Sequence, residues 1–182
     1  MDSYWEWNKE NFPWHYDPSS KQKDVQYVGR FTCDNFEEVV QQAVSRFKPE
    51  DEYDEVSFKG EPYNDEAKEI MEGYHNDLTR AGFTKHNTGG RQTRDHLPRQ
   101  LVEMAQKSGL WNPQIMFLEQ PPGKFIPWHR DSYNNYRRNF AKVSDEHEVI
   151  RYLVQLNDWQ WGHYVSVGND VIHQYQIGDI HC

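Results

Sequence analysis

The sequence predicts an α+β protein with an antiparallel β core and helices packed outside it. Apolar residues recur at three- and four-residue intervals between positions 34 and 109, as they do along helices. From position 111 onward the pattern changes to short β-like runs separated by turn residues. Helices first and short strands afterwards are typical of the α+β class. A length of 182 residues suits one domain, with 1–110 as support and 111–182 as the core.

Residues 1–31 are rich in aromatic side chains but show no regular spacing. We expect an irregular arm that packs its rings on the core, with a ring-lined ligand surface as the alternative. The first helix then begins after Asp34, a favoured N-cap residue, with Glu37 at the capping-box position. Its apolar stripe continues to Phe47, and Pro49 ends it.

Two further helices are predicted before the β region. The second covers about 65–81, and Gly82 can end it in a left-handed conformation. The third covers about 95–109 and accepts Pro98 in its first turn. Between them, residues 84–94 contain a Gly-Gly pair and polar residues, which predict a mobile loop.

The predicted strands are short, and turn residues separate them. The turn signals are Pro121-Pro122-Gly123, Gly168-Asn169-Asp170 and Gly178-Asp179. The predicted strands cover about 56–59, 114–119, 124–129, 149–157, 163–167 and 171–177.

Composition narrows the function classes. A net charge of −9 argues against a general nucleic-acid or acidic-membrane surface, although Arg130, Arg137, Arg138 and Lys142 form a local basic cluster. No apolar run has the length of a membrane span, and the first residues do not have the pattern of a signal peptide. The 2 cysteines form no motif, which indicates a reducing, cytoplasmic setting.

The most informative motif is His129-Arg130-Asp131, at the end of a predicted strand. Residues two apart on a strand point the same way, so His129 and Asp131 would present an imidazole nitrogen and a carboxylate oxygen at one place. These are two of the three ligands in the 2-His-1-carboxylate face that holds non-haem Fe(II). With 9 His and 29 acidic residues, such a triplet is expected roughly 1.4 times by chance.

The triplet occurs three times, and context separates the three. His75-Asn76-Asp77 lies in a predicted helix, where positions two apart diverge by about 200° around the axis. His15-Tyr16-Asp17 lies between two prolines with no strand pattern before it. The triplet at 129 alone has a strand leading in and further strands behind, so His129 and Asp131 are the predicted metal ligands.

Residues 111–182 resemble the Fe(II)/2-oxoglutarate-dependent oxygenases, nearest the prolyl-hydroxylase-like branch. The approach to the metal strand reads PPGKFIPWHRD, the next two strands read RYLVQLNDWQWGHYVSV, and QIGDIHC has the Gly that opens a late core strand. The resemblance implies a double-stranded β-helix (jelly-roll, cupin-like) core. It also implies Fe(II) as cofactor and 2-oxoglutarate as cosubstrate, which is decarboxylated to succinate while a substrate is hydroxylated.

The resemblance carries His129 and Asp131 over as the first two iron ligands. In the family a distal His follows the strand opened by a residue such as Gly178, and an Arg or Lys that binds 2-oxoglutarate comes about ten residues later. Both are expected beyond Cys182, where the sequence given stops. His181 on the Gly178 strand, and the earlier His173 and His163, are weaker candidates for the third ligand. A carboxylate at position 131 favours hydroxylation over halogenation.

The substrate is expected to be a small molecule or a peptide. Rings and cations that flank the metal pair could present it, or could simply pack and solvate a loop. They are Trp128, Tyr133, Tyr136, Arg137 and Arg138. Arg151 could reach a carboxylate inside the barrel or point to solvent. A non-catalytic jelly-roll binding or structural protein is the main alternative, and a cupin-like protein with another divalent metal is a further one.

Overall fold

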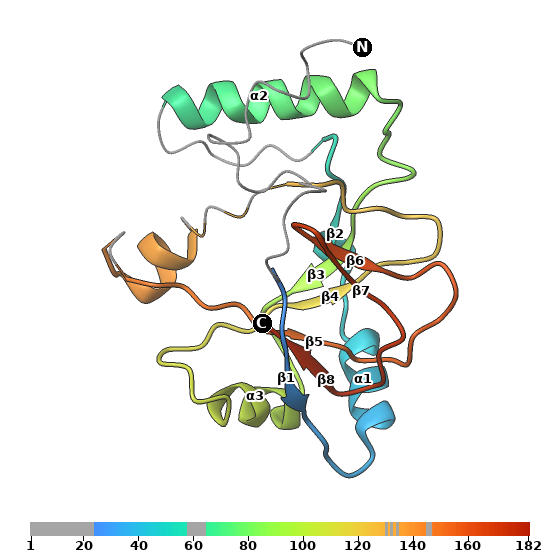
Figure 1. Ribbon diagram of the computed structural model, residues 1–182, viewed down its shortest axis with the longest axis vertical. Coiled ribbons are helices and arrows are strands. Elements are labelled where there is room, and N and C mark those ends of the chain that lie inside the picture. Colours follow the sequence, from blue (N-terminus) through green and yellow to red (C-terminus); the bar gives the residue numbers. More distant parts are fainter. Residues whose placement is uncertain (1–23, 58–64, 130, 132, 134, 145–146) are drawn as a thin grey trace. The chain divides into compact units, whose positions relative to one another are not determined.

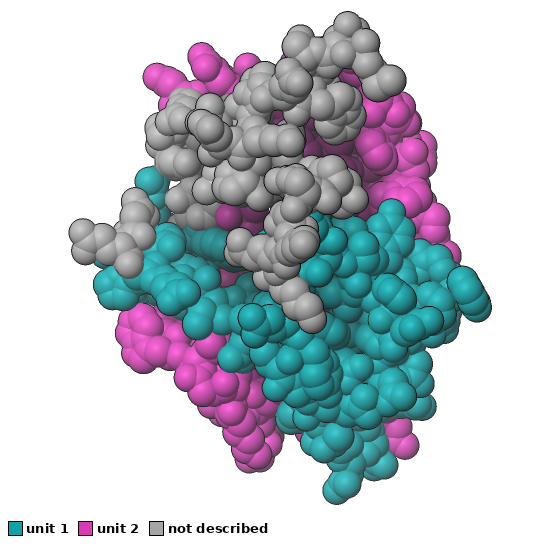
Figure 2. Space-filling model, viewed as in Figure 1, with its two compact units in different colours: residues 1–37, 132–182 teal, residues 38–131 magenta. Residues whose placement is uncertain are grey.

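The structure is a computed structural model that describes residues 24–57, 65–129, 131, 133, 135–144 and 147–182 (Figure 1). It confirms the α+β class, with several small antiparallel sheets and helices. The chain divides into two compact units (Figure 2): unit 1 comprises residues 1–37 and 132–182, and unit 2 comprises residues 38–131. Among the described residues, no helix has both the length and the apolar character that a membrane crossing requires.

The main sheet of unit 1 has the order β1-β8-β5, and all its pairings are antiparallel (Figure 1). Its members are β1 (Tyr27–Arg30), β5 (Leu153–Val154) and the central β8 (Asp179–His181). The Gly178-Asp179 signal is confirmed, since β8 begins directly after Gly178. The expectation that residues 1–31 are irregular throughout is wrong at its end, because 27–30 pair with β8; residues 1–23 lie outside the described part.

Unit 1 also contains a two-stranded hairpin, β6 (Val165–Val167) and β7 (Asp170–Ile172), at the predicted Gly168-Asn169 turn. Carboxylates fix this turn. Asp170 Oδ2 accepts hydrogen bonds from the backbone N–H groups of Asp24 and Val25 at 2.5 and 2.9 Å, and Asp24 Oδ2 accepts one from Asn169 N–H at 2.9 Å. A short π-helix, η3 (Tyr136–Ala141), completes the described elements of the unit.

Unit 2 contains the sheet β2-β3-β4, which is also antiparallel. Its strands are β2 (Glu52–Tyr53), β3 (Gly90–Thr93) and β4 (Phe117–Glu119), and the 3-10 turn η2 (Pro49–Asp51) precedes β2. The prediction of a mobile loop over 84–94 is wrong, because 90–93 form the central strand. Of the strand expected at 56–59, residues 58 and 59 lie outside the described part, and Ser57 closes a turn by donating its backbone N–H to Asp54.

Close backbone approach explains why a Gly-Gly pair lies at the start of β3, with Gly90 as its first residue and Gly89 just before it. A Cβ on Gly89 would collide with the Tyr53 carbonyl oxygen, and a Cβ on Gly90 would collide with the Glu119 carbonyl oxygen. The two glycines therefore let the outer strands approach the central one more closely than any side chain would permit. The polar residues and the glycines of this segment predicted a loop. The glycines instead serve the sheet, because a residue with a Cβ atom would not fit at either position.

The three predicted α-helices are confirmed as α1 (Phe36–Ser45), α2 (Asp65–Arg80) and α3 (Arg99–Gln106). Gly82 ends α2 as expected, with a φ of +86°. Phe83 N–H donates to Leu78 O at 3.0 Å and Gly82 N–H donates to Thr79 O at 3.1 Å, which is the Schellman pattern. Pro98 lies at the N-cap of α3, so this helix begins about four residues later than predicted.

Among the described residues, the buried apolar side chains form small clusters. In unit 2 the ring of Phe47 packs on Phe117 with centroids 5.3 Å apart, and the guanidinium of Arg91 lies over Phe47 at 4.6 Å. The buried apolar side chains of unit 2 are Val39, Ala43, Leu78, Leu101 and Phe117, and those of unit 1 are Phe36, Ile172 and Tyr175.

The predicted strands are longer than the observed ones, and the jelly-roll arrangement stays a prediction. Residues 149–157 contain the two-residue strand β5, and residues 124–129 contain one isolated bridge, Thr88 with Phe125, which is parallel. Short strands leave few ladder bonds in each sheet, so side-chain to backbone bonds carry more of the stabilisation. The assignment of 1–182 to a single domain likewise stays a prediction.

We expect Gly90→Ala to destabilise the protein by about 2–4 kcal/mol, because its new Cβ would meet the backbone of β4. Gly73→Ala is the matched control, since Gly73 lies within α2 with open space around its Cα. That change should stabilise by up to about 1 kcal/mol, as Ala exceeds Gly in helix propensity. Urea unfolding measures both, and equal effects of the two changes would contradict the close-approach argument.

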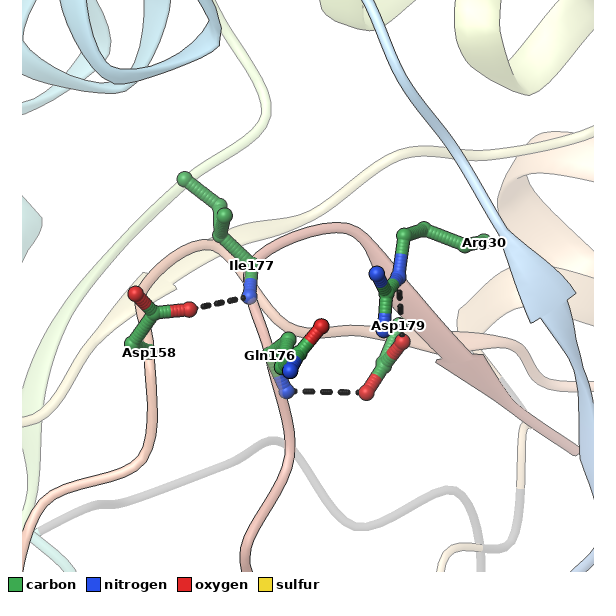
Figure 3. A network of polar contacts seen from close by, with 5 residues as sticks. All are labelled: Arg30, Asp158, Gln176, Ile177 and Asp179. Atoms are coloured by element: carbon green, nitrogen blue, oxygen red, sulfur yellow. Dashed lines mark hydrogen bonds and ion pairs between the residues drawn. The ribbon is translucent and has the colours of Figure 1, made fainter.

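Asp179 is the buried carboxylate of unit 1, and it accepts hydrogen bonds from Arg30 Nε and Gln176 N–H, each at 2.8 Å (Figure 3). Burial alone would raise the pKa of Asp179, but these two bonds and the guanidinium charge outweigh it and hold the pKa below its usual value. A lowered folded-state pKa means that the ionised carboxylate stabilises the fold. This contribution is present above about pH 4 and is lost as the pH falls through the folded-state pKa.

Asp179→Asn should therefore lower the free energy of unfolding by about 1–2 kcal/mol at pH 7, since an amide cannot satisfy both donors equally. The difference from the wild type should shrink as the pH falls below about 4. Thermal unfolding from pH 7 to pH 3 measures this. Asp77→Asn, whose side chain is 63% exposed, is the control and should have little effect. A difference independent of pH would show that the charge of Asp179 is not responsible.

Candidate metal site

His129 and Asp131 lie together in unit 2. The shortest distance between their charged groups is 3.6 Å, from His129 Nε2 to Asp131 Oδ1. The residues do not lie on a regular strand, contrary to the prediction for 124–129, because the chain bends at Trp128. Their donor atoms nevertheless lie close together, as expected. Arg130 lies outside the described residues.

The segment before His129 is fixed by hydrogen bonds to residues 87–89. Phe125 N–H donates to Asn87 O, and Gly89 N–H donates to Phe125 O, both at 2.8 Å. The predicted turn at Pro121 is confirmed, since Lys124 N–H donates to Pro121 O at 3.1 Å. Phe125, four residues before His129, is therefore anchored by these bonds, and Pro127, two residues before His129, is buried.

The imidazole of His129 is oriented by its own backbone. His129 Nδ1 lies 2.8 Å from the Pro127 carbonyl oxygen. A carbonyl oxygen only accepts, so Nδ1 carries the proton and donates. In the neutral ring Nε2 then keeps its lone pair, and this is the nitrogen that faces Asp131. A carbonyl partner on the second ring nitrogen is the usual support of a metal-binding histidine.

The two donors fit a divalent cation in type and nearly in spacing. Ligands bound at about 2.1 Å on neighbouring corners of an octahedron lie roughly 3 Å apart, so the observed 3.6 Å is within 1 Å of that spacing. The side chains are 39% and 37% exposed, so a ligand can reach them and water screens their mutual attraction. Within the described residues no three His, Cys, Asp or Glu side chains converge as a complete metal site.

The other predicted ligands belong to unit 1. His181 lies on the central strand β8, with its Nδ1 buried and without a hydrogen-bond partner among the described residues, and its ring contacts Tyr27 at 5.7 Å edge-on. His173 and His181 both line a small hollow of about 160 Å³ together with Asp170. The carbonyl of His163 accepts the indole N–H of Trp159. A role for any of them as the third ligand stays a prediction.

Sequence reasoning missed Glu55, which unit 2 places in the electrostatic surroundings of the pair. Burial raises the pKa of Glu55, and the charges of His129 and then His75 oppose that shift. Glu55 N–H donates to Thr88 Oγ1 at 3.3 Å, and Thr88 is the fully buried residue bridged to Phe125. Glu55 lies in an acidic stretch, 50–55, in which sequence alone gave no reason to prefer one carboxylate.

Tyr74 on α2 lies beside this carboxylate. Burial raises the pKa of Tyr74, and the charge of Glu55 raises it further. Its hydroxyl is buried and has no hydrogen-bond partner among the described residues. His75 follows it on α2, with ring centroids 6.0 Å apart. Unit 2 therefore places the buried Tyr74 hydroxyl in the surroundings of Glu55, on which the charge of His129 also acts.

The residues predicted to face the substrate belong to both units, Trp128 to unit 2 and Tyr133, Tyr136 and Arg137 to unit 1. Trp128 is 46% exposed beside the pair, whereas Tyr136 stacks on Phe140 within η3 and Arg137 donates to Ser144 O at 3.0 Å. Burial raises the pKa of Tyr133, and negative charge at the nearby Cys182 adds to that shift. These contacts show that part of the set packs and caps a loop of unit 1.

Comparisons of the chain with protein-family models, with curated proteins and with solved structures find no match. The geometry of His129, Asp131 and Glu55 therefore stands by itself as the evidence on function.

We expect Glu55→Gln to stabilise the protein at pH 7 by up to about 1 kcal/mol, because burial penalises the charged form of Glu55. A raised folded-state pKa makes the carboxylate unfavourable once the pH rises above its ordinary value of about 4.3, so the gain should disappear near pH 4. Urea unfolding at both pH values measures it. Glu52→Gln, at an exposed position, is the control, and a loss of stability in Glu55→Gln would contradict the assignment.

Proposed function

We propose that the chain is an Fe(II)- and 2-oxoglutarate-dependent dioxygenase that hydroxylates a small-molecule or peptide substrate. The observation that carries the proposal is the pair His129 and Asp131, with donor atoms 3.6 Å apart and the second imidazole nitrogen bound to the Pro127 carbonyl. The strands that follow support it. They come in the order β5, β6, β7 and β8, with a glycine opening the last, as the resemblance implies. We also propose that these strands belong to a jelly-roll core.

His129 Nε2 and the Asp131 carboxylate would hold the iron. When bound with 2-oxoglutarate and O2, iron supplies the oxidative decarboxylation to succinate and the hydroxylation of a C–H bond. The Pro127 carbonyl keeps the Nδ1 proton in place, so that Nε2 stays available as a donor. Asp131 contributes the negative charge that a halogenase lacks at this position, which supports hydroxylation.

Glu55 contributes to the same site at longer range. A second, partly buried carboxylate near His129 raises the local preference for a cation over a neutral ligand. Binding of a cation would reduce the cost of burying the Glu55 carboxylate, because a nearby positive charge favours its ionised form. A carboxylate whose pKa is shifted by burial and by a neighbouring charge is typical of functional sites.

The decisive test uses the protein expressed from its complete reading frame. Anaerobic addition of Fe(II) and 2-oxoglutarate should give the visible charge-transfer band of the chelated metal. His129→Ala should abolish the band, and Asp131→Ala should weaken metal affinity at least tenfold, since each removes a ligand. His86→Ala is the matched control, an exposed histidine of the same unit, and should leave the band unchanged.

Two outcomes would contradict the proposal. A band that persists in His129→Ala would show that the metal binds elsewhere. No band in the wild type would remove the oxygenase assignment altogether. O2 is then added to a sample that shows the band, and succinate is measured. Succinate formation distinguishes an active enzyme from a protein that only binds metal.

A non-catalytic binding protein is the second candidate. It is favoured by the exposure of Trp161, which is 90%, beside the ring of Trp159 at 5.1 Å. Paired, exposed aromatic rings of this kind offer a ligand a flat apolar face with a polar edge. Metal binding without succinate formation would support this candidate.

A further inference from the structure

A hollow of about 570 Å³ lies within unit 1, where the loop 158–162 meets the segment 174–177. Its volume is in the usual range for small-molecule sites. Its lining combines polar and aromatic side chains, among them Arg30, Asp158, Trp159, Gln174, Tyr175 and Gln176. We propose that this hollow, with the neighbouring Trp161, binds a neutral carbohydrate.

The frame of the hollow is held by carboxylates bound to backbone amides (Figure 3). Asp158 Oδ1 accepts the Ile177 N–H at 2.8 Å, and Asp179 Oδ2 accepts the Gln176 N–H at 2.8 Å. Trp159 N–H donates to Tyr175 O at 3.0 Å, which ties the two walls together. Walls fixed before a ligand arrives lower the entropic cost of binding it.

The aromatic side of the hollow is also oriented in advance. Trp159 donates its indole N–H to His163 O at 2.6 Å, so this ring is not free to rotate. Trp161 packs against it with centroids 5.1 Å apart, yet is 90% exposed. An exposed indole offers a flat apolar face. The C–H groups on one face of a pyranose ring pack on such a surface, while its hydroxyls remain available to polar partners.

The polar side offers the planar groups that bind neighbouring hydroxyls in pairs. Arg30 bonds Asp179 through Nε, which leaves its terminal amino groups as donors. The second carboxylate oxygen of Asp158 is an acceptor, and the exposed carboxamides of Gln174 and Gln176 each offer a donor and an acceptor. This combination matches a ligand with several hydroxyls and no charge.

The charge balance favours a neutral ligand over an anion. Asp179 neutralises Arg30, and Asp158 leaves the hollow with one net negative charge. A phosphate or a carboxylate would be repelled there, so the hollow is not suited to 2-oxoglutarate or to a nucleotide. The site is therefore separate in chemistry from the proposed oxygenase site and does not depend on it.

The test titrates the metal-free protein with the methyl glycosides of glucose, galactose, mannose and N-acetylglucosamine. Tryptophan fluorescence and saturation-transfer NMR follow binding. At least one glycoside should give a saturable signal with a dissociation constant in the millimolar range or tighter, while inorganic phosphate at the same concentration should give none.

Two substitutions locate the binding. Trp161→Ala should weaken it at least tenfold without affecting folding, because this side chain is almost fully exposed. Gln174→Asn should weaken it several-fold, since the position has a φ of +55° that Asn tolerates while the carboxamide is shortened. Trp111→Ala, an exposed tryptophan of unit 2 at 71%, is the control and should leave affinity unchanged.

Absence of saturable binding by all four glycosides would overturn the proposal. Equal weakening by Trp161→Ala and Trp111→Ala would overturn the location, and saturable phosphate binding that Trp161→Ala abolishes would overturn the neutral-ligand assignment. Because neither iron nor 2-oxoglutarate is present, these results are independent of the outcome for the oxygenase proposal.

Discussion

Close approach of backbone to backbone, at positions where only glycine fits, is the constraint on which both units depend. In unit 2 the Gly89-Gly90 pair lies against the carbonyls of Tyr53 and Glu119. In unit 1 Gly178, with a φ of +88°, lies against the Phe31 carbonyl and accepts a hydrogen bond from Phe31 N–H at 2.9 Å. Both sheets have strands of two to four residues, so losing one such approach removes a large share of their pairing.

These approaches also determine where the functional groups lie. Gly89 bonds Phe125, and the chain leaves that contact toward Pro127 and His129. Gly178 directly precedes β8, whose first residue, Asp179, fixes Gln176 and Arg30 at the hollow. The candidate metal pair and the candidate sugar site are thus each placed by a close backbone contact within one unit, between residues far apart in the sequence. Neither depends on a long regular strand, which the described part of the chain does not contain.

Local signals predicted the helices well, and they predicted the strands less well. The apolar stripes of α1, α2 and α3 and the Gly82 terminator act within one helix, so a single sequence shows them. The strands depend on partners far along the chain, as β1 depends on β8 and β3 on β4, and no local pattern reports those partners. The donor atoms of His129 and Asp131 lie close together as predicted, although the chain bends there and does not form a regular strand. The sequence could not single out Glu55, because burial is what distinguishes it from the other carboxylates of the stretch 50–55.

The acidic composition bears on the order in which the metal and 2-oxoglutarate would bind at the proposed oxygenase site. Asp131 and Glu55 give the surroundings of His129 a negative charge, in a chain whose net charge is −9. A dianionic cosubstrate meets repulsion there until a divalent cation offsets it, whereas a cation is attracted at once. On the proposed function, affinity for 2-oxoglutarate in this protein therefore depends on prior binding of the metal by His129 and Asp131. The hollow of unit 1, with its own single negative charge, needs no such cation because its proposed ligand is neutral.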